Sequence, residues 1–123
     1  MKTMHFRFLI EGRAFTARMQ DTALVREIAD HCPVRQSWQR SGDHEYYTRL
    51  RKSVHAAGEK GTSEIRKNRL YLFPAWNAFS ITFREMSIAP YKVIELGEFA
   101  EDVSSVLETA PDDLRILCEA EAR

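Results

Sequence analysis

The chain has 123 residues, which is the usual length of one domain and enough to bury a single hydrophobic core. Hydrophobic residues make up 44% of it and charged residues 29%, a composition that is typical of a globular protein and excludes a wholly disordered chain. The net charge at pH 7 is zero, which argues against a dedicated nucleic-acid binder, because such proteins usually carry a strong positive field.

The sequence shows no sign of a membrane span or an export signal. No apolar run approaches the ~20 residues that cross a bilayer, and the first residues alternate instead of forming an apolar stretch. We therefore expect a cytoplasmic protein. Its two cysteines, Cys32 and Cys118, are far apart and form no CxxC pair, so we expect reduced thiols on apolar faces.

Charge is spread unevenly along the chain. Lysine and arginine outnumber the acidic residues over 1–69, and the reverse holds over 70–123. Either a basic and an acidic surface balance within one domain, or the basic part forms a face for an anionic ligand.

The first predicted elements are a hairpin and a helix. Apolar and polar residues alternate over residues 6–11 and again over 15–19, and Gly12 lies between the two runs as the turn. Asp21 or Thr22 can cap a helix, which Pro33 ends. The apolar stripe of this helix is Leu24, Val25, Ile28, Ala29 and Cys32.

Short strands and turns follow. Lys52–Arg69 is charged, holds almost no apolar residues and is predicted to be a long surface loop. Before this loop, strands are predicted at 34–40 and 45–51, joined by a turn at 41–43. After it, strands are predicted at 70–73 and 79–83 around a turn at 74–77, followed by a loop with Pro90 and a strand at 91–96 closed by Gly97. The chain ends with a helix, marked by Phe99, Val103, Val106 and Leu107 and stopped by Pro111, and a last strand at 114–118.

This order gives eight short strands and only two helices. Such strands must bury their faces in a sandwich or a barrel, and closure removes exposed edges. We predict a mainly β fold: a closed eight-stranded barrel with two helices, in a single domain over residues 1–123.

Three segments carry a family resemblance: Phe6–Cys32, Arg69–Phe83 and Ala89–Phe99. Together with the element order they are similar to the cyclophilin fold, an eight-stranded barrel with a helix covering each open end. The chain resembles in particular a group of small bacterial and archaeal cyclophilin-like proteins of unknown function. The resemblance implies a fold and no assigned activity.

The chain departs from the related patterns at two places. A Gly-Asp pair commonly precedes the strand matching 70–73 in that group, whereas residues 66–69 here read Arg-Lys-Asn-Arg. True prolyl isomerases pair an arginine with a Phe-x-x-Gln run on adjoining strands. Arg49 and Arg51 lie in a comparable region, but the Lys-Ser-Val-His that follows does not match.

No motif indicates a catalytic or metal centre. Both cysteines lie on apolar stripes, where inert buried thiols are the norm, and the four histidines lack the spacing of metal ligands. Residues 58–63 have two glycines but not the ending of a phosphate-binding loop. We expect no metal and no cofactor, and whether the chain is an enzyme stays open.

The candidate ligand-binding residues are Tyr47, Arg49, Arg51 and Trp76. In a strand the first three share one face, and an arginine offers a planar fork of donors to a carboxylate or phosphate. Trp76 lies at a predicted turn, and Phe73 and Tyr91 could complete an aromatic wall. The alternative is that the arginines are solvated or paired with acidic residues and that the aromatic residues belong to the core.

Three functions remain open from the sequence. The preferred one is a binding module for a small anionic or peptide-like ligand. The second is a prolyl isomerase in which Arg49 or Arg51 donates a hydrogen bond to the proline, and the third is a structural role in a homodimer.

Overall fold

The computed structural model describes residues 2–121. The barrel strands are β1 (Thr3–Ile10), β2 (Arg13–Gln20), β3 (Val34–Ser41), β4 (Glu45–Arg49), β6 (Arg69–Phe73), β7 (Ala78–Thr82), β9 (Ile94–Phe99) and β10 (Asp113–Ala120). The remaining elements are the helices α1 (Ala23–Ala29) and α2 (Val103–Glu108), the 3₁₀ turn η1 (Pro74–Trp76), and the short strands β5 (Glu64–Ile65) and β8 (Met86–Ser87).

The predicted first hairpin is present as β1 and β2. These strands pair along their full length, and the two residues between them, Glu11 and Gly12, have positive φ angles of 51° and 77°. Such angles match the twist of a hairpin and are accessible to glycine without strain. Buried and exposed side chains alternate along β1, so one face of the hairpin points into the core.

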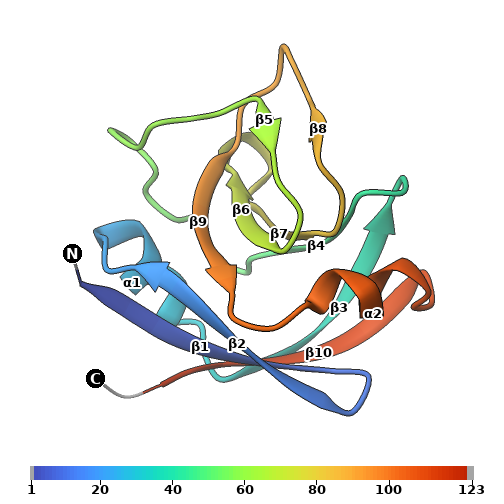
Figure 1. The fold of residues 1–123 in the computed structure, drawn as a ribbon. Helices are drawn as coiled ribbons and strands as arrows, with labels where there is room; N and C mark the ends of the chain where they lie inside the picture. Colours follow the sequence, from blue (N-terminus) through green and yellow to red (C-terminus); the bar gives the residue numbers. More distant parts are fainter. Residues whose placement is uncertain (1, 122–123) are drawn as a thin grey trace.

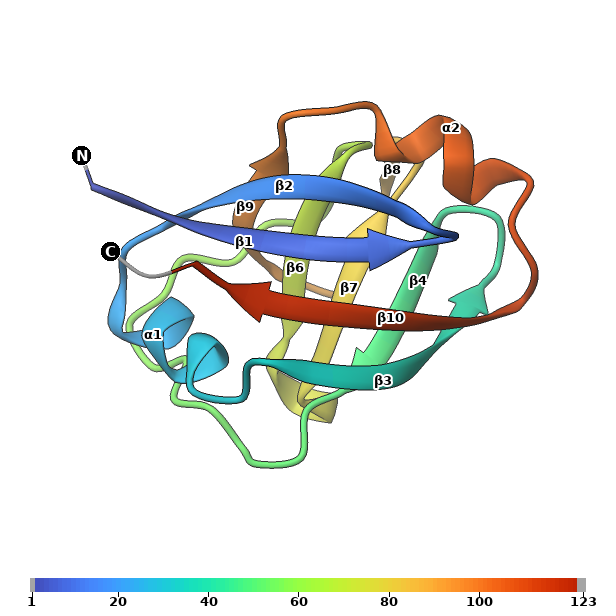
Figure 2. The ribbon, with the colours of Figure 1, turned by 90° about the horizontal axis from the view of Figure 1, so that it is seen from below.

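The eight long strands close in the order β1-β10-β3-β4-β7-β6-β9-β2, with every neighbouring pair antiparallel. Figure 1 shows the ribbon of the barrel coloured along the chain, and Figure 2 shows α1 and α2 at opposite ends of the barrel. The predicted mainly β fold, a closed eight-stranded barrel with two helices, is confirmed.

Aromatic rings fill the barrel interior. Phe8 packs against Trp38, Phe79 and Phe99 with ring centroids 5.3 to 6.4 Å apart, and all four side chains are buried. Each such pair contributes about 0.5–1.5 kcal/mol beyond the burial of its surface. Because the rings occupy the interior, as in other small barrels, a ligand site is to be sought on the outer wall.

Both helices are short and begin at a side-chain cap. The Thr22 hydroxyl accepts a hydrogen bond from the backbone N–H of Val25, and Asp102 accepts one from Ser105. The first helix ends at Ala29, earlier than the limit that the proline sets, and the residues between form a turn.

Strand β9 continues through the glycine that was predicted to close it. Phe99 therefore belongs to this strand and not to the second helix. A Cβ at Gly97 would lie 2.0 Å from the carbonyl oxygen of Arg18 on β2. The glycine permits the close approach of two strands, which a sequence pattern cannot distinguish from a turn.

The segment Lys52–Arg69 is not entirely a loop, which corrects the prediction. It contains β5, which pairs with β8 in a two-stranded sheet that stands apart from the barrel in Figure 1. Strands of two residues are too short to show any periodicity, so no sequence pattern predicts them.

The two cysteines, distant in sequence, meet at the end of α1. The Sγ atoms of Cys32 and Cys118 are 3.5 Å apart, and both residues are free thiols. Neither helix in the described part of the chain is long and apolar enough to cross a membrane.

Candidate functional site

A pocket of about 390 Å³ lies on the outer face of β4, β7 and β6. This volume falls within the range of small-molecule sites. Its lining residues are Ser41, His44, Glu45, Tyr47, Ile65, Tyr71, Phe73, Trp76, Ala78, Ser80, Ile88, Tyr91 and Val93.

Small side chains on β7 make room for the pocket. Ala78 and Ser80 alternate outward from the barrel and form part of its lining, yet every residue of β7 is buried. Its outer face is covered by apolar residues of the segments around β5 and β8, namely Ile65, Ile88 and Val93. The pocket is therefore the space between the barrel wall and this added layer.

The aromatic rings of Phe73, Trp76 and Tyr91 form part of the pocket lining and its exposed rim. Phe73 contacts Trp76 and Tyr91 with centroids 5.6 and 6.2 Å apart, and the last two side chains are 59% and 63% exposed. Trp76 is positioned by η1, which ends at Asn77 in the left-handed conformation (φ 51°). The Asn77 amide donates to the carbonyl oxygen of Leu50 at 3.1 Å, which ties this turn to the end of β4.

The structure brings together three of the four predicted site residues. Tyr47 and Trp76 line the pocket, and the Arg49 guanidinium lies 5.8 Å from the centroid of the Trp76 ring. Arg51 is not among them: β4 ends at Arg49, two residues before the predicted end, and Arg51 lies in the following bend with its side chain exposed. The strand ends there because Asn77, which lies opposite Leu50, has a left-handed conformation, and its N–H donates to the carbonyl oxygen of Pro74 instead of to β4.

Sequence reasoning missed Glu45 and His44, which lie at the other end of β4. Glu45 precedes Tyr47 and Arg49 with the same alternation, and this spacing was the available signal. Burial raises the pKa of the Glu45 carboxyl to about 7 and lowers the pKa of His44. Nε2 of His44 is 3.8 Å from the Glu45 carboxylate, too far for a hydrogen bond. At the pH at which the Glu45 carboxyl ionises, the His44 ring is largely neutral. The ring therefore compensates little of the negative charge on Glu45.

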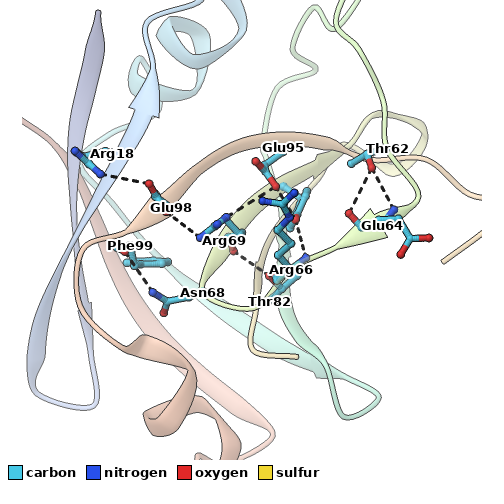
Figure 3. A network of polar contacts seen from close by, with 11 residues as sticks. Arg18, Thr62, Glu64, Arg66, Asn68, Arg69, Thr82, Glu95, Glu98 and Phe99 are labelled. Atoms are coloured by element: carbon cyan, nitrogen blue, oxygen red, sulfur yellow. Dashed lines mark hydrogen bonds and ion pairs between the residues drawn. The ribbon is translucent and has the colours of Figure 1, made fainter. Parts of the chain in front are cut away.

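A polar network holds the covering layer in place (Figure 3). The backbone N–H of Arg66 donates to the Tyr71 hydroxyl at 2.9 Å, and that hydroxyl donates to Glu95 at the same distance. Burial raises the pKa of Tyr71 to about 12, so this donor stays protonated. The Thr82 hydroxyl donates to the carbonyl oxygen of Arg66, and Arg69 forms an ion pair with Glu98.

The pocket lining combines two ionisable groups with aromatic rings. Within residues 2–121 no three histidine, cysteine or acidic side chains come together in a way that could hold a metal ion. None of the described residues lining the pocket is a lysine or arginine. What the pocket presents is one carboxyl group, one imidazole and a wall of aromatic rings.

Comparison with known proteins assigns the family. The model of the Cyclophilin-like family matches residues 8–119, most of the chain. The chain belongs to the Cyclophilin-like family. Its fold is similar to the solution structure of the hypothetical protein AF2241 from Archaeoglobus fulgidus, with a TM-score of 0.71 and 19% identity over 95% of this chain and 94% of that one. No curated protein matches the sequence.

Membership in the Cyclophilin-like family confirms the resemblance seen in the sequence. It accounts for the barrel and the covering helices. Neither the family nor the AF2241 structure assigns a ligand or a reaction, so function has to be argued from the pocket itself.

Proposed function

We propose that this chain is a binding protein for a short peptide-like ligand. An apolar or aromatic group of the ligand enters the pocket, and its carboxylate meets Arg49. The observation that carries this proposal is the aromatic rim, where Trp76 and Tyr91 expose more than half of their surface beside a pocket of about 390 Å³. Covering such surface is favourable by about 25 cal/mol per Å².

Arg49 supports a negatively charged group at this rim. Its guanidinium lies over the Trp76 ring, and within residues 2–121 it forms no ion pair with a carboxylate of the chain. Stacking on a ring leaves the donors at the edge of the guanidinium plane available to a carboxylate. Arg51 serves as the matched control, because it lies in the bend after β4, whereas Arg49 is the arginine that stacks on Trp76.

Binding is preferred to the two other functions for specific reasons. A prolyl isomerase needs a donor directed at the proline inside its pocket, whereas Arg49 lies at the rim. A homodimer would cover Trp76 and Tyr91 with a second copy. A sedimentation measurement separates this case, because a concentration-independent monomer excludes it.

The test uses the two tryptophans, of which Trp38 is buried and Trp76 is 59% exposed. The probe is the peptide acetyl-norleucine-Ala-Ala-Phe with a free carboxylate. We expect saturable binding that shifts the emission of Trp76 to shorter wavelength, since the ligand removes water from the ring. Trp76→Phe should abolish the shift, with binding of the variant then followed by calorimetry.

The carboxylate is tested by comparison. Arg49→Ala should weaken binding about two- to fivefold, as expected for an exposed charge pair, and Arg51→Ala should leave it unchanged. The C-terminal amide of the same peptide should lose the same factor on the native protein. Absence of saturable binding at millimolar peptide would refute the proposal.

A further inference from the structure

The outer face of β4 is polarised from one end to the other. Glu45, Tyr47 and Arg49 alternate on the same side of the strand, with the acid and the aromatic ring lining the pocket and the arginine at the rim. Arg49 is four residue steps along the strand from Glu45, which places the two residues roughly 13 Å apart. The two ends therefore present opposite charges to one bound ligand.

Glu45 has no partner that satisfies its charge. Its side chain is 25% exposed, and no hydrogen bond in the described part of the chain reaches its carboxylate. Its cross-strand neighbours are Ser41 on β3 and Thr82 on β7, both neutral. A carboxylate held in such a place is costly unless a cation reaches it.

The charged groups around this end do not supply that cation. His44 is the nearest ionisable neighbour on the adjoining turn, and burial keeps its ring neutral at pH 7. Tyr47 and Tyr71 line the pocket with phenol rings, which supply no cation. Arg69, on the strand beyond β7, is paired with Glu98 at 2.9 Å.

We infer that the Glu45 end of the pocket binds a cationic group of the ligand, an ammonium or a guanidinium. The inference rests on the proposed function and specifies its ligand: a peptide-like chain with a basic side chain about four residues before its carboxylate. A cation fits the lining, because it pairs with the carboxylate and is attracted to the faces of the surrounding tyrosine rings. A second carboxylate at this end would be repelled.

The same arrangement makes binding depend on pH. The bound cation favours the ionised form of Glu45, and the pKa of this carboxyl is about 7 in the free protein. Affinity for a basic ligand therefore rises as pH increases through 7 and levels off above it. Protonation of His44 at lower pH acts in the same direction, so a variant at Glu45 is needed to separate the two groups.

The experiment compares two peptides that differ only in charge. Acetyl-Lys-Ala-Ala-Phe and acetyl-norleucine-Ala-Ala-Phe have side chains of similar length, and an extended chain of four residues spans roughly 13 Å. At about pH 8 we expect the lysine peptide to bind about tenfold more tightly, and at about pH 5.5 we expect the preference to disappear. Glu45→Gln should abolish the preference at about pH 8 while still binding the norleucine peptide. Glu64→Gln, which changes an exposed acid of β5 outside the lining, should leave it intact.

Each outcome decides a different point. Equal binding of the two peptides at about pH 8 would overturn the cation site and leave the proposed function standing. A lysine preference that persists in Glu45→Gln would overturn the role of this residue. Failure of both peptides to bind would overturn the proposed function and the inference together.

Discussion

The buried carboxyl of Glu45 gives the fold a specific dependence on pH. Its pKa is about 7 in the folded protein against 4.5 for a free side chain, and the cause is burial. The folded state thus binds the proton more tightly than the unfolded state does. The contribution of this proton to the free energy of unfolding is fully present below about pH 4.5, decreases as pH rises towards 7, and is absent well above 7. The difference in pKa corresponds to about 3 kcal/mol.

The variant Glu45→Gln removes the ionisation and keeps the shape of the side chain. We expect it to match the native protein at about pH 4.5 and to be more stable by about 3 kcal/mol at about pH 8.5. Urea denaturation at several pH values measures this difference, and Glu64→Gln is the control, because that side chain is exposed. A difference between Glu45→Gln and the native protein that does not change with pH would refute the argument, since a packing effect has no reason to follow the titration of this carboxyl.

Three further predictions concern the framework. Gly97→Ala should destabilise the protein by more than about 2 kcal/mol in urea denaturation, because the added Cβ would lie 2.0 Å from a backbone atom. The control Gly58→Ala should cost only about 1 kcal/mol, because Gly58 has a φ of +87° but open space around it. Asn77→Ala removes a side chain that suits the left-handed conformation and donates to two backbone carbonyls, so we expect a loss of about 1–2 kcal/mol and a change in Trp76 fluorescence. Diamide should remove one hydrogen from each of Cys32 and Cys118 and join their sulfur atoms, which are 3.5 Å apart, in a disulfide. The protein should then lose both titratable thiols without forming a dimer. Retention of both thiols would contradict the 3.5 Å separation.

The sequence predicted the barrel because its signals are local. Alternation along residues 6–11 and 15–19 requires one buried face, and eight short strands can bury their faces by closing into a barrel. Where prediction failed, the deciding contact lies far away in the chain. Gly97 resembles a strand end until the backbone of Arg18 is placed against it. The free thiols of Cys32 and Cys118 were predicted correctly, whereas their proximity depends on the fold.

The candidate site was predictable to the same extent. The alternation of β4 correctly placed Tyr47 and Arg49 on the outer face, and the turn residue Trp76 reached them through η1. Arg51 lay beyond the end of the strand, because the left-handed Asn77 opposite Leu50 directs its N–H to Pro74 and so ends the pairing of β4 with β7. Glu45 began the predicted strand at 45–51 and was not proposed as a site residue, because no local pattern shows that it lines a pocket together with Ile65, Ile88 and Val93.

The register of β4 joins the stability of the barrel to the geometry of the site. Tyr46 is fully buried, and its hydroxyl donates to the carbonyl oxygen of Pro111 at 2.7 Å. A slip by one residue would place this ring outside and turn Glu45, Tyr47 and Arg49 into the apolar core, which is strongly unfavourable. The core residue therefore fixes which side chains face the pocket. A rigid strand holds the Glu45 carboxylate and the Arg49 guanidinium at a fixed separation, and we propose that this separation selects the length of the ligand.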